Sequence, residues 1–402
     1  MSLGNIGQQF AVVAISLQVY AFTGSSLAVG LVGLFALVPL VVLGLYGGAI
    51  VDAHDRRTVA LVSAVLLWTV SLATAAQAWL GAHSVLLLYV LVAAQSSAFA
   101  VNNPARSTII PALVRRDQLP AANALSMLSF QLGFAIGPIL GGLLVGRYGF
   151  KAAYTVDAVT YLAALTGIWR LPPLPPEGEP RRAGLRSVLE GLRFLGTRPN
   201  VRMTFLVDLA AMVLAQPRAL FPAIGTVVLG GGATTAGALM SAMAVGSIGS
   251  TVLSGPLGHV RRQGVAVLAC VAGWGLAVIG FGAVCLLAVA QGHPAGSASW
   301  LVWPAMLALA LSGAADAVSA VFRTTILQSA TPDSLRGRLQ GVFIVVVAGG
   351  PRLGDLVSGG AGTVLGEPLA ALAGGLACVA AVVALARWQP RFARYDAAHP
   401  EP

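Results

Sequence analysis

The chain has 402 residues, of which 57% are apolar and only 9% are charged. Soluble domains carry about 25% charged residues, so this composition excludes a soluble globular protein and indicates a polytopic membrane protein. The formal net charge is +10, and Lys151 is the only lysine among the 24 basic residues. A motor that uses the Gly-Lys-Ser/Thr loop to bind ATP is therefore excluded.

Apolar runs long enough to cross a bilayer follow one another along the whole chain. The first six helices are predicted near residues 3–22, 27–50, 59–80, 85–105, 124–145 and 152–170. The second six are predicted near residues 204–228, 236–257, 265–290, 300–321, 341–364 and 369–387. This pattern predicts an all-α membrane protein with 12 transmembrane helices in two six-helix bundles.

A long interval rich in proline separates the two sets of helices. It contains five prolines between residues 172 and 180, followed by an amphipathic stretch at 187–195, and this composition is typical of a linker with an interfacial helix. We therefore divide the chain into four parts: an N-terminal bundle (1–170), a cytoplasmic linker (171–202), a C-terminal bundle (203–388) and a cytoplasmic tail (389–402).

Arginines gather in alternate loops, in the linker and in the tail. Because basic loops stay on the cytoplasmic side, the pattern predicts a multi-pass protein of the plasma (inner) membrane with both termini cytoplasmic. The short arginine clusters lie between apolar runs, so no nucleic-acid partner is expected. No basic residue precedes the first run. Either the first turns of helix 1 are missing because Met1 is a misplaced start, which we favour, or later loops set the orientation alone.

The two halves of the sequence resemble each other. Arg106-Ser-Thr-Ile-Ile after helix 4 recurs as Arg323-Thr-Thr-Ile-Leu after helix 10, and Gly137-Pro138 in helix 5 recurs as Gly350-Pro351 in helix 11. Two parallel repeats of six helices are the architecture of secondary transporters that rock between two conformations.

Together with these repeats, the turn between helices 2 and 3 resembles the motif of the major facilitator superfamily. The matching positions are Gly48, Asp52, Arg56 and Arg57, and the departures are Ala53 and Asp55. The resemblance implies that Asp52 contacts the N-terminal end of helix 11 and Arg106, and so latches the two halves on the cytoplasmic side. A loop that only sets the topology is the alternative.

Helix 5 resembles the antiporter motif of drug-exporting members of this superfamily. Its small and helix-bending residues are Gly133, Gly137, Pro138, Gly141 and Gly142. Small residues one turn apart let another helix approach closely, which fits an exporter better than an uptake permease. Across the chain, residues 23–30, 103–106, 193–195 and 331–338 resemble the enterobactin-exporter-like branch of the superfamily.

Charged residues at membrane depth are costly and are candidates for function. Six are predicted there: Asp157, Asp208, Arg218, Asp316, Arg352 and Asp355. Arg352 and Asp355 share one helix face and can neutralise each other, and Arg323 lies two turns after Asp316. We expect the acids and arginines of the second half to couple proton movement to transport, first through Asp316 and then Asp208. Static ion pairs that only fix helix packing are the alternative, and Asp157 is expected to be structural.

Polar residues at helix positions in the first half are candidates to line a central cavity. They are Asn5, Gln8 and Gln9 on helix 1, and Gln95 and Asn102 on helix 4. Hydrogen bonding between helices explains them equally well. No histidine or cysteine has metal-ligand spacing, so we expect neither a metal nor a cofactor.

These observations together predict a monomeric secondary transporter that exports a small molecule by alternating access, driven by protons, with membrane lipid as its surroundings. The substrate is a siderophore or an amphipathic drug, and the branch resemblance favours the siderophore. The alternatives are a facilitator or uptake permease of the same fold, a membrane-embedded lipid enzyme, for which no catalytic constellation is found, and a sensor or scaffold, which would require a larger soluble domain.

Overall fold

A computed structural model describes residues 2–175, 193, 195–252, 255–292, 297–330 and 333–396. Nearly all of these residues are helical, and the chain folds into two compact units. Unit 1 is Met1–Gly24 with Leu31–Leu185, and unit 2 is Ser25–Gly30 with Arg186–Pro402. The first turn of the second helix thus belongs to unit 2. The four-part division of the chain made from the sequence stays a prediction.

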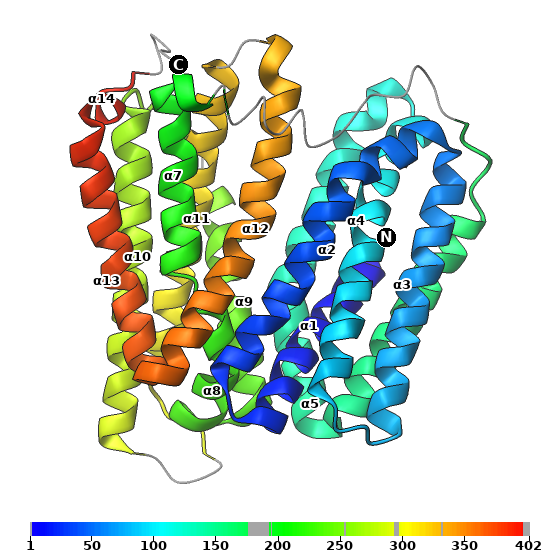
Figure 1. Ribbon diagram of the computed structural model, residues 1–402, viewed down its shortest axis with the longest axis horizontal. Helices are drawn as coiled ribbons and strands as arrows, with labels where there is room; N and C mark the ends of the chain where they lie inside the picture. The colour runs from blue at the N-terminus through cyan, green and yellow to red at the C-terminus, as the bar shows by residue number, and fades with distance from the viewer. Residues whose placement is uncertain are drawn as a thin grey trace. The chain divides into compact units, whose positions relative to one another are not determined.

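Unit 1 is built from five long helices (Figure 1). They are α1 (Ser2–Thr23), α2 (Ser26–Ala53), α3 (Arg56–Trp79), α4 (Val85–Leu113) and α5 (Leu119–Trp169), with a short 3-10 turn, η1 (Arg116–Gln118), before α5. The fourth helix is longer than the predicted 85–105, because it continues through Pro104 and Pro111.

The predicted helices 124–145 and 152–170 are joined without a loop. α5 runs from Leu119 to Trp169, and its regular conformation is interrupted at Gly149, where φ is 77° and ψ is 179°. Residues with a side chain are strained at this positive φ, whereas glycine, which has no Cβ atom, is not. The prediction of two spans is compatible with this geometry. A connecting segment was expected between them, and the structure has a single sharp kink there instead.

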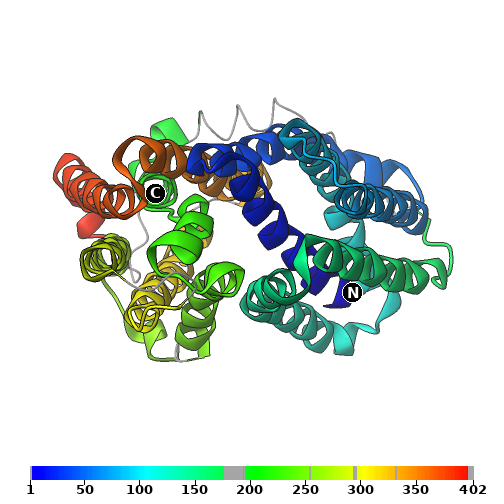
Figure 2. The ribbon, with the colours of Figure 1, turned by 90° about the horizontal axis from the view of Figure 1, so that it is seen from below.

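Unit 2 contains the remaining helices. They are α7 (Pro199–Leu214), η2 (Arg218–Leu220), α8 (Phe221–Ala223), η3 (Ile224–Val228), α9 (Gly232–Val252), η4 (Gly255–His259), α10 (Gln263–Gln291), α11 (Val302–Ser329), α12 (Asp333–Leu365), α13 (Glu367–Trp388) and α14 (Pro390–Ala393). Viewed along the helices in Figure 2, the long helices of each unit lie roughly parallel to one another. Nine helices or joined helical segments among the described residues are long and apolar enough to cross a membrane.

The prediction of one continuous helix at 204–228 is wrong. α7 ends at Leu214, and the chain then passes through a 3-10 turn, one short α-helical segment and a π-helical turn. Pro217 follows the break and cannot donate the hydrogen bond that would continue the helix. The indole Nε1 of Trp274 donates to the carbonyl of Ala215 at 3.2 Å, so a backbone acceptor freed by the break is satisfied inside the protein, as lipid surroundings require. Arg218 therefore lies in an irregular turn and not within a regular helix.

Glycines allow the helices of unit 2 to pack at close range. A Cβ atom at Gly246 of α9 would collide with the backbone of Ala310 on α11, and one at Gly313 of α11 would collide with the backbone of Met243. Because lipid tails are as apolar as leucine, helices in a membrane associate through such close packing and through polar contacts. The abundance of glycine in this sequence therefore has a direct structural use.

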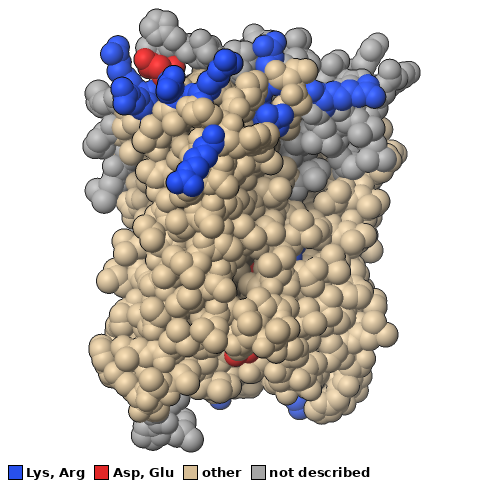
Figure 3. All heavy atoms as spheres, turned by 60° about the vertical axis from the view of Figure 1, so that its left-hand side comes forward, with Lys and Arg blue, Asp and Glu red and all other residues tan. Residues whose placement is uncertain are grey.

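Basic side chains gather at one end of the helices. On the face seen in Figure 3, most of the blue side chains lie at the upper end of the view. In unit 2, the guanidinium of Arg202 at the start of α7 lies 4.9 Å from the ring centroid of Trp388 at the end of α13. Arg261 and Arg262, just before α10, are exposed, as are Arg387 and Arg391.

Asp55 holds the end of unit 1 together at the turn between α2 and α3. Its carboxylate accepts hydrogen bonds from the backbone N–H of Thr58 at 2.7 Å and from the N–H of Leu174 at 2.6 Å. The Arg56 N–H donates to the Leu174 carbonyl at 2.9 Å, and Arg57 donates to the Trp169 carbonyl at 2.8 Å. The turn thus anchors the chain that leaves α5. Burial raises the pKa of Asp55, but the hydrogen bonds from Thr58 and Leu174 outweigh burial, so this pKa is lowered overall.

Replacing Asp55 by alanine removes a helix cap and the anchor at Leu174. We expect Asp55→Ala to lower the free energy of unfolding by about 1 kcal/mol, and Asp55→Asn, which keeps one acceptor oxygen, to lower it less. The measurement is thermal unfolding of the purified protein followed by tryptophan fluorescence. Because folding lowers this pKa, the charged carboxylate contributes its full stabilisation above pH 3.8 and loses it as the pH falls through the lowered pKa. The difference between the wild type and Asp55→Asn should therefore shrink on acidification, and an equal difference at every pH would contradict this role.

The small residues of α5 make a second prediction possible. A Cβ atom at Gly141 would lie 3.1 Å from the Cα of Phe10 on α1, whereas one at Gly167 of the same helix would meet nothing within 4 Å. We expect Gly141→Ala to destabilise the protein by about 1–3 kcal/mol through overpacking. Gly167→Ala, the matched control, should be neutral or stabilising because alanine favours helix. Equal unfolding temperatures for the two variants would show that α1 does not press on α5 at Gly141.

Candidate functional site

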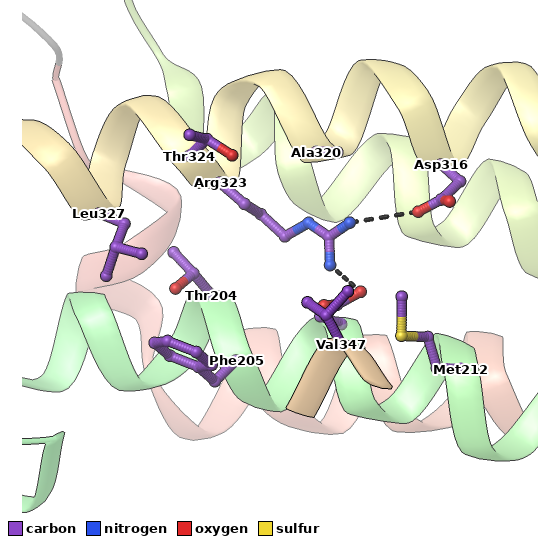
Figure 4. A pocket seen from close by; sticks show the side chains of 10 residues that line it. Thr204, Phe205, Met212, Asp316, Ala320, Arg323, Thr324, Leu327 and Val347 are labelled. Atoms are coloured by element: carbon purple, nitrogen blue, oxygen red, sulfur yellow. Dashed lines mark hydrogen bonds and ion pairs between the residues drawn. The ribbon is translucent and has the colours of Figure 1, made fainter. Parts of the chain in front are cut away.

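One arginine bridges two acids inside unit 2 (Figure 4). Arg323 of α11 forms an ion pair with Asp208 of α7 through Nη1 and donates to Asp316 of α11 through Nη2 at 3.2 Å. The side chains of Arg323 and Asp208 are 10% and 6% exposed, whereas that of Asp316 is 36% exposed. With both acids ionised, this cluster has a net charge of −1, so a single proton would neutralise it.

The helices explain why these three residues meet. Asp316 and Arg323 are seven residues apart on α11, which is about two helical turns, so they share one face. Asp208 lies on α7, which packs against α11. The ion pair therefore joins Asp208 to a residue of another helix, Arg323.

A cavity of about 160 Å³ surrounds this cluster. Its other lining residues are Thr204, Phe205, Met212, Ala320, Thr324, Leu327 and Val347. Pockets for drug-sized ligands occupy roughly 300–1,000 Å³, so in this conformation the cavity has room for water or one small group of a ligand. Its apolar wall with one charged cluster suits movement of an ion better than enclosure of a whole cargo molecule.

A second set of charges lies beside the break that follows α7. Arg352 and Asp355 come from α12, and Arg218 comes from η2, which packs against α12. Arg218 acts electrostatically on Asp316, Asp355 and Arg352, so it connects the two sets. Among the described residues, no ion pair within 4.0 Å joins any of these three side chains to an oppositely charged group.

The expectation that Arg352 and Asp355 can neutralise each other stays a prediction, and in this structure the two side chains form no ion pair within 4.0 Å. Their spacing places them on the same side of α12, but a shared face does not bring the two charged ends together. One carboxylate oxygen of Asp355 is instead buried, with no hydrogen-bond donor in the described part of the chain. The two residues interact electrostatically at longer range.

The polar residues predicted to line a cavity in the first half lie in different surroundings. Asn102 is buried and donates to the Ser63 hydroxyl of α3 at 2.9 Å, which favours the interhelical alternative. Gln9 is also buried, and Gln95 is half-buried and hydrogen-bonds Tyr161. The side chain of Asn5 lies outside the described residues. These hydrogen bonds of Asn102 and Gln95 are with α3 and α5, and the cavity-lining role of these residues stays a prediction.

Asp157 lies among other buried polar groups of unit 1. It is 1% exposed and accepts a hydrogen bond from the Ser71 hydroxyl at 2.5 Å. Nearby in the chain, the Tyr154 hydroxyl donates to Gln18 at 2.6 Å, and Gln18 also pairs with Gln77. These cross-helix contacts of Gln18 were not expected from the sequence, because nothing in the spacing of single polar residues reveals their partners.

The structure describes only part of the motif between helices 2 and 3, but all of the glycine and proline positions of the antiporter motif. The surroundings of Gly48 and the side chain of Asp52 lie outside what the structure describes, so the latch from Asp52 to Arg106 and helix 11 stays a prediction. Asp55, which departs from the motif, is the N-cap of α3, and an aspartate just before an apolar run was a signal that could have revealed this. On α5 the antiporter-motif residues Gly133, Gly137, Pro138, Gly141 and Gly142 are all buried.

Relatives of this chain have been identified by sequence. A family model described as "Transmembrane secretion effector" matches residues 1–401. The enterobactin exporter EntS of Shigella boydii serotype 18 is 30% identical over 375 residues, which cover 93% of this chain and 85% of that protein. The enterobactin exporter EntS of Citrobacter koseri is 29% identical over 365 residues, which cover 91% of this chain and 83% of that protein.

Solved structures share the fold at low sequence identity. The POT family transporter PepTSo has a TM-score of 0.74 at 12% identity, with 98% of each chain covered. A D-xylose-proton symporter has a TM-score of 0.71 at 12% identity, covering 96% of this chain and 95% of that chain. A bacterial homologue of the iron transporter ferroportin, in its inward-facing state, has a TM-score of 0.67 at 15% identity, covering 98% and 96%.

At these identities the structural likeness establishes the fold alone, and it confirms the predicted fold class of 12 transmembrane helices in two bundles. The match of the family model over nearly the whole chain confirms the predicted resemblance to the major facilitator superfamily. The chain belongs to the transmembrane secretion effector family of major facilitator superfamily transporters.

Proposed function

We propose that this protein exports a siderophore or a similar amphipathic small molecule by alternating access, driven by protons that enter through the cluster of Arg323, Asp208 and Asp316. Two relatives that are about 30% identical carry the name enterobactin exporter, which supports a siderophore as the cargo. The observation that carries the proton-coupled mechanism is one guanidinium shared by two carboxylates in a small internal cavity.

The unequal exposure of the two acids suggests an order of events. Asp316 is the more exposed acid, and its contact with Arg323 is the longer one. A proton arriving at Asp316 would cancel the attraction on that side and leave Arg323 paired with Asp208 alone. Loss of the proton would restore the bridge. Such a change in the contacts of one arginine between α7 and α11 is the kind of two-state element that an alternating transporter requires.

The proposal includes the orientation of the chain in the membrane. We place both termini on the cytoplasmic side of the inner membrane, because the end of the helices near Arg202, Arg261 and Arg391 is rich in basic residues. The protein acts as a monomer in this proposal, and no residue has a catalytic role, since the relatives named above are transporters. An uptake permease of the same fold is the second candidate, and the direction of transport separates the two.

The test uses inverted membrane vesicles, in which an exporter fills the vesicle lumen. We expect wild-type vesicles to accumulate added enterobactin when a proton gradient is applied, and a protonophore to stop the accumulation. Asp316→Asn should lower the transport rate at least tenfold, which corresponds to a rise of about 1.4 kcal/mol or more in the activation free energy. Asp117→Asn is the matched control, because Asp117 is exposed and pairs with Arg115 at the turn before α5.

The outcomes separate the parts of the proposal. Accumulation that ignores the protonophore would refute proton coupling, and accumulation that occurs only in right-side-out vesicles would refute export in favour of uptake. A loss of transport in Asp117→Asn equal to that in Asp316→Asn would refute the assignment of the proton site to the cluster.

The ion pair between Arg323 and Asp208 can be tested by stability alone. Because both side chains are buried, Arg323→Met should lower the free energy of unfolding by about 3–5 kcal/mol, since it leaves Asp208 charged and unpaired. The double variant Arg323→Met with Asp208→Asn should be more stable than the single variant, because it leaves no buried charge on α7. Thermal unfolding of the purified proteins measures both. The single variant Asp208→Asn completes the comparison. If the losses in the two single variants add up to the loss in the double variant, the two residues are not coupled.

A further inference from the structure

The second set of charges in unit 2 has more cations than anions. This set contains Arg218, Arg352 and one carboxylate, that of Asp355, so it has a net charge of +1 when Asp355 is ionised. As reported above, no carboxylate in the described part of the chain lies within 4.0 Å of either guanidinium. Arginines at membrane depth are normally paired, so these two are unusual.

The helix break after α7 brings these charges to one place. Gly354, which lies between Arg352 and Asp355 in the sequence, packs against the end of α7, since a Cβ atom there would lie 2.8 Å from the Cβ of Gln216. Arg218 follows Gln216 by two residues and acts electrostatically on both Arg352 and Asp355. The first turn of α2 also approaches α12, at the Asp355 carbonyl, through Gly30, a residue without a side chain.

Hydrogen bonding at this place is incomplete. Gln216 is only 4% exposed, and its side-chain oxygen has no donor among the described residues. The buried oxygen of Asp355 has none either. Buried polar groups are normally satisfied, so these two acceptor oxygens call for a donor from outside the described chain, such as water, beside the two arginines.

The exposure of the arginines shows where that partner could approach. Arg218 is exposed and Arg352 is half-buried, yet Arg218 lies within the apolar stretch Pro199–Val228. A guanidinium in this position cannot face hydrocarbon without a large cost. It must therefore face a water-filled path through which a solute can reach it.

We propose that Arg218 and Arg352 form an anion-binding subsite that holds a carboxylate group of the cargo. Guanidinium groups bind such paired oxygens through two parallel, charge-assisted hydrogen bonds. An anion also neutralises the excess charge of this set. The inference deepens the proposed function, because it names the chemical class of the transported molecule.

The alternative is that the two arginines only balance the acids of the neighbouring cluster. The cluster of Arg323, Asp208 and Asp316 has a net charge of −1, so the six charges together sum to zero. In that case both arginines would stabilise the protein without preferring an anionic ligand, and binding measurements distinguish the two possibilities.

The experiment compares two probes of nearly equal shape, 2,3-dihydroxybenzoate and its neutral amide, for binding to the purified protein in nanodiscs by calorimetry. We expect wild type to bind the benzoate at least about tenfold more tightly than the amide, and Arg218→Gln and Arg352→Gln each to remove most of this preference. Asp355→Asn removes the competing negative charge and should increase benzoate affinity several-fold. Arg262→Gln, in the exposed loop before α10, is the matched control and should leave the preference unchanged.

A wild type that binds both probes equally, or Arg218→Gln and Arg352→Gln variants that keep the full preference, would overturn the inference. If Arg218→Gln does not fold, Arg218→Lys, which keeps the charge, replaces it. An Arg218→Lys variant that keeps at least part of the preference for the benzoate supports the subsite. One that loses the whole preference with an unchanged melting temperature overturns the inference. Anion preference in a protein that transports no siderophore would refute the proposed function but not the subsite. Transport of enterobactin by a protein without any anion preference would refute the subsite but not the proposed function.

Discussion

The cost of leaving polar groups unsatisfied in hydrocarbon governs this structure. Water is absent from the bilayer core, so each backbone group and each charge must find its partner inside the protein. Long helices solve this problem for the backbone. Where the helix breaks after Leu214, the indole of Trp274 caps a free carbonyl, and where three ionisable side chains meet, Arg323 serves two acids at once. The same constraint makes the incompletely paired set around Arg218 and Arg352 informative.

Packing follows from the same surroundings. Since burial from lipid provides little gain, helices in this protein approach until backbone meets backbone, as at Gly246 and Gly313 between α9 and α11. On α12, Gly354 packs in the same way against the backbone of Met212 on α7, and Met212 lines the cavity of the Arg323 cluster. The functional charges thus depend on residues that carry no chemistry of their own.

Much of the fold could be predicted from the sequence, because membrane helices are long, apolar and bounded by basic loops. The hydropathy pattern placed the spans of α3, α10 and α13 within a few residues of their observed ends. The kink at Gly149 and the break at Pro217 were missed, because an apolar run looks the same whether the chain inside it is straight or bent. Proline alone was not decisive, since Pro104 and Pro111 lie within the continuous helix α4.

The candidate site was only partly predictable. Spacing on one helix showed that Asp316 and Arg323 share a face, but it gave no distance. Arg352 and Asp355 also share a face, yet they form no ion pair within 4.0 Å in the structure. The pairing of Asp208 with Arg323 joins residues more than a hundred positions apart, which periodicity cannot reveal. Asp55 was noted only as a departure from the superfamily motif, whereas its observed contacts are those of a helix cap and an anchor for the chain after α5.

The kink at Gly149 has a consequence for how unit 1 moves. Two neighbouring membrane crossings are joined there by a single glycine in a left-handed conformation, so neither can slide or rotate far without dragging the other. We therefore expect the two segments to move together, and almost no polypeptide is left at the kink for a protease to cut or for an inserted tag to occupy.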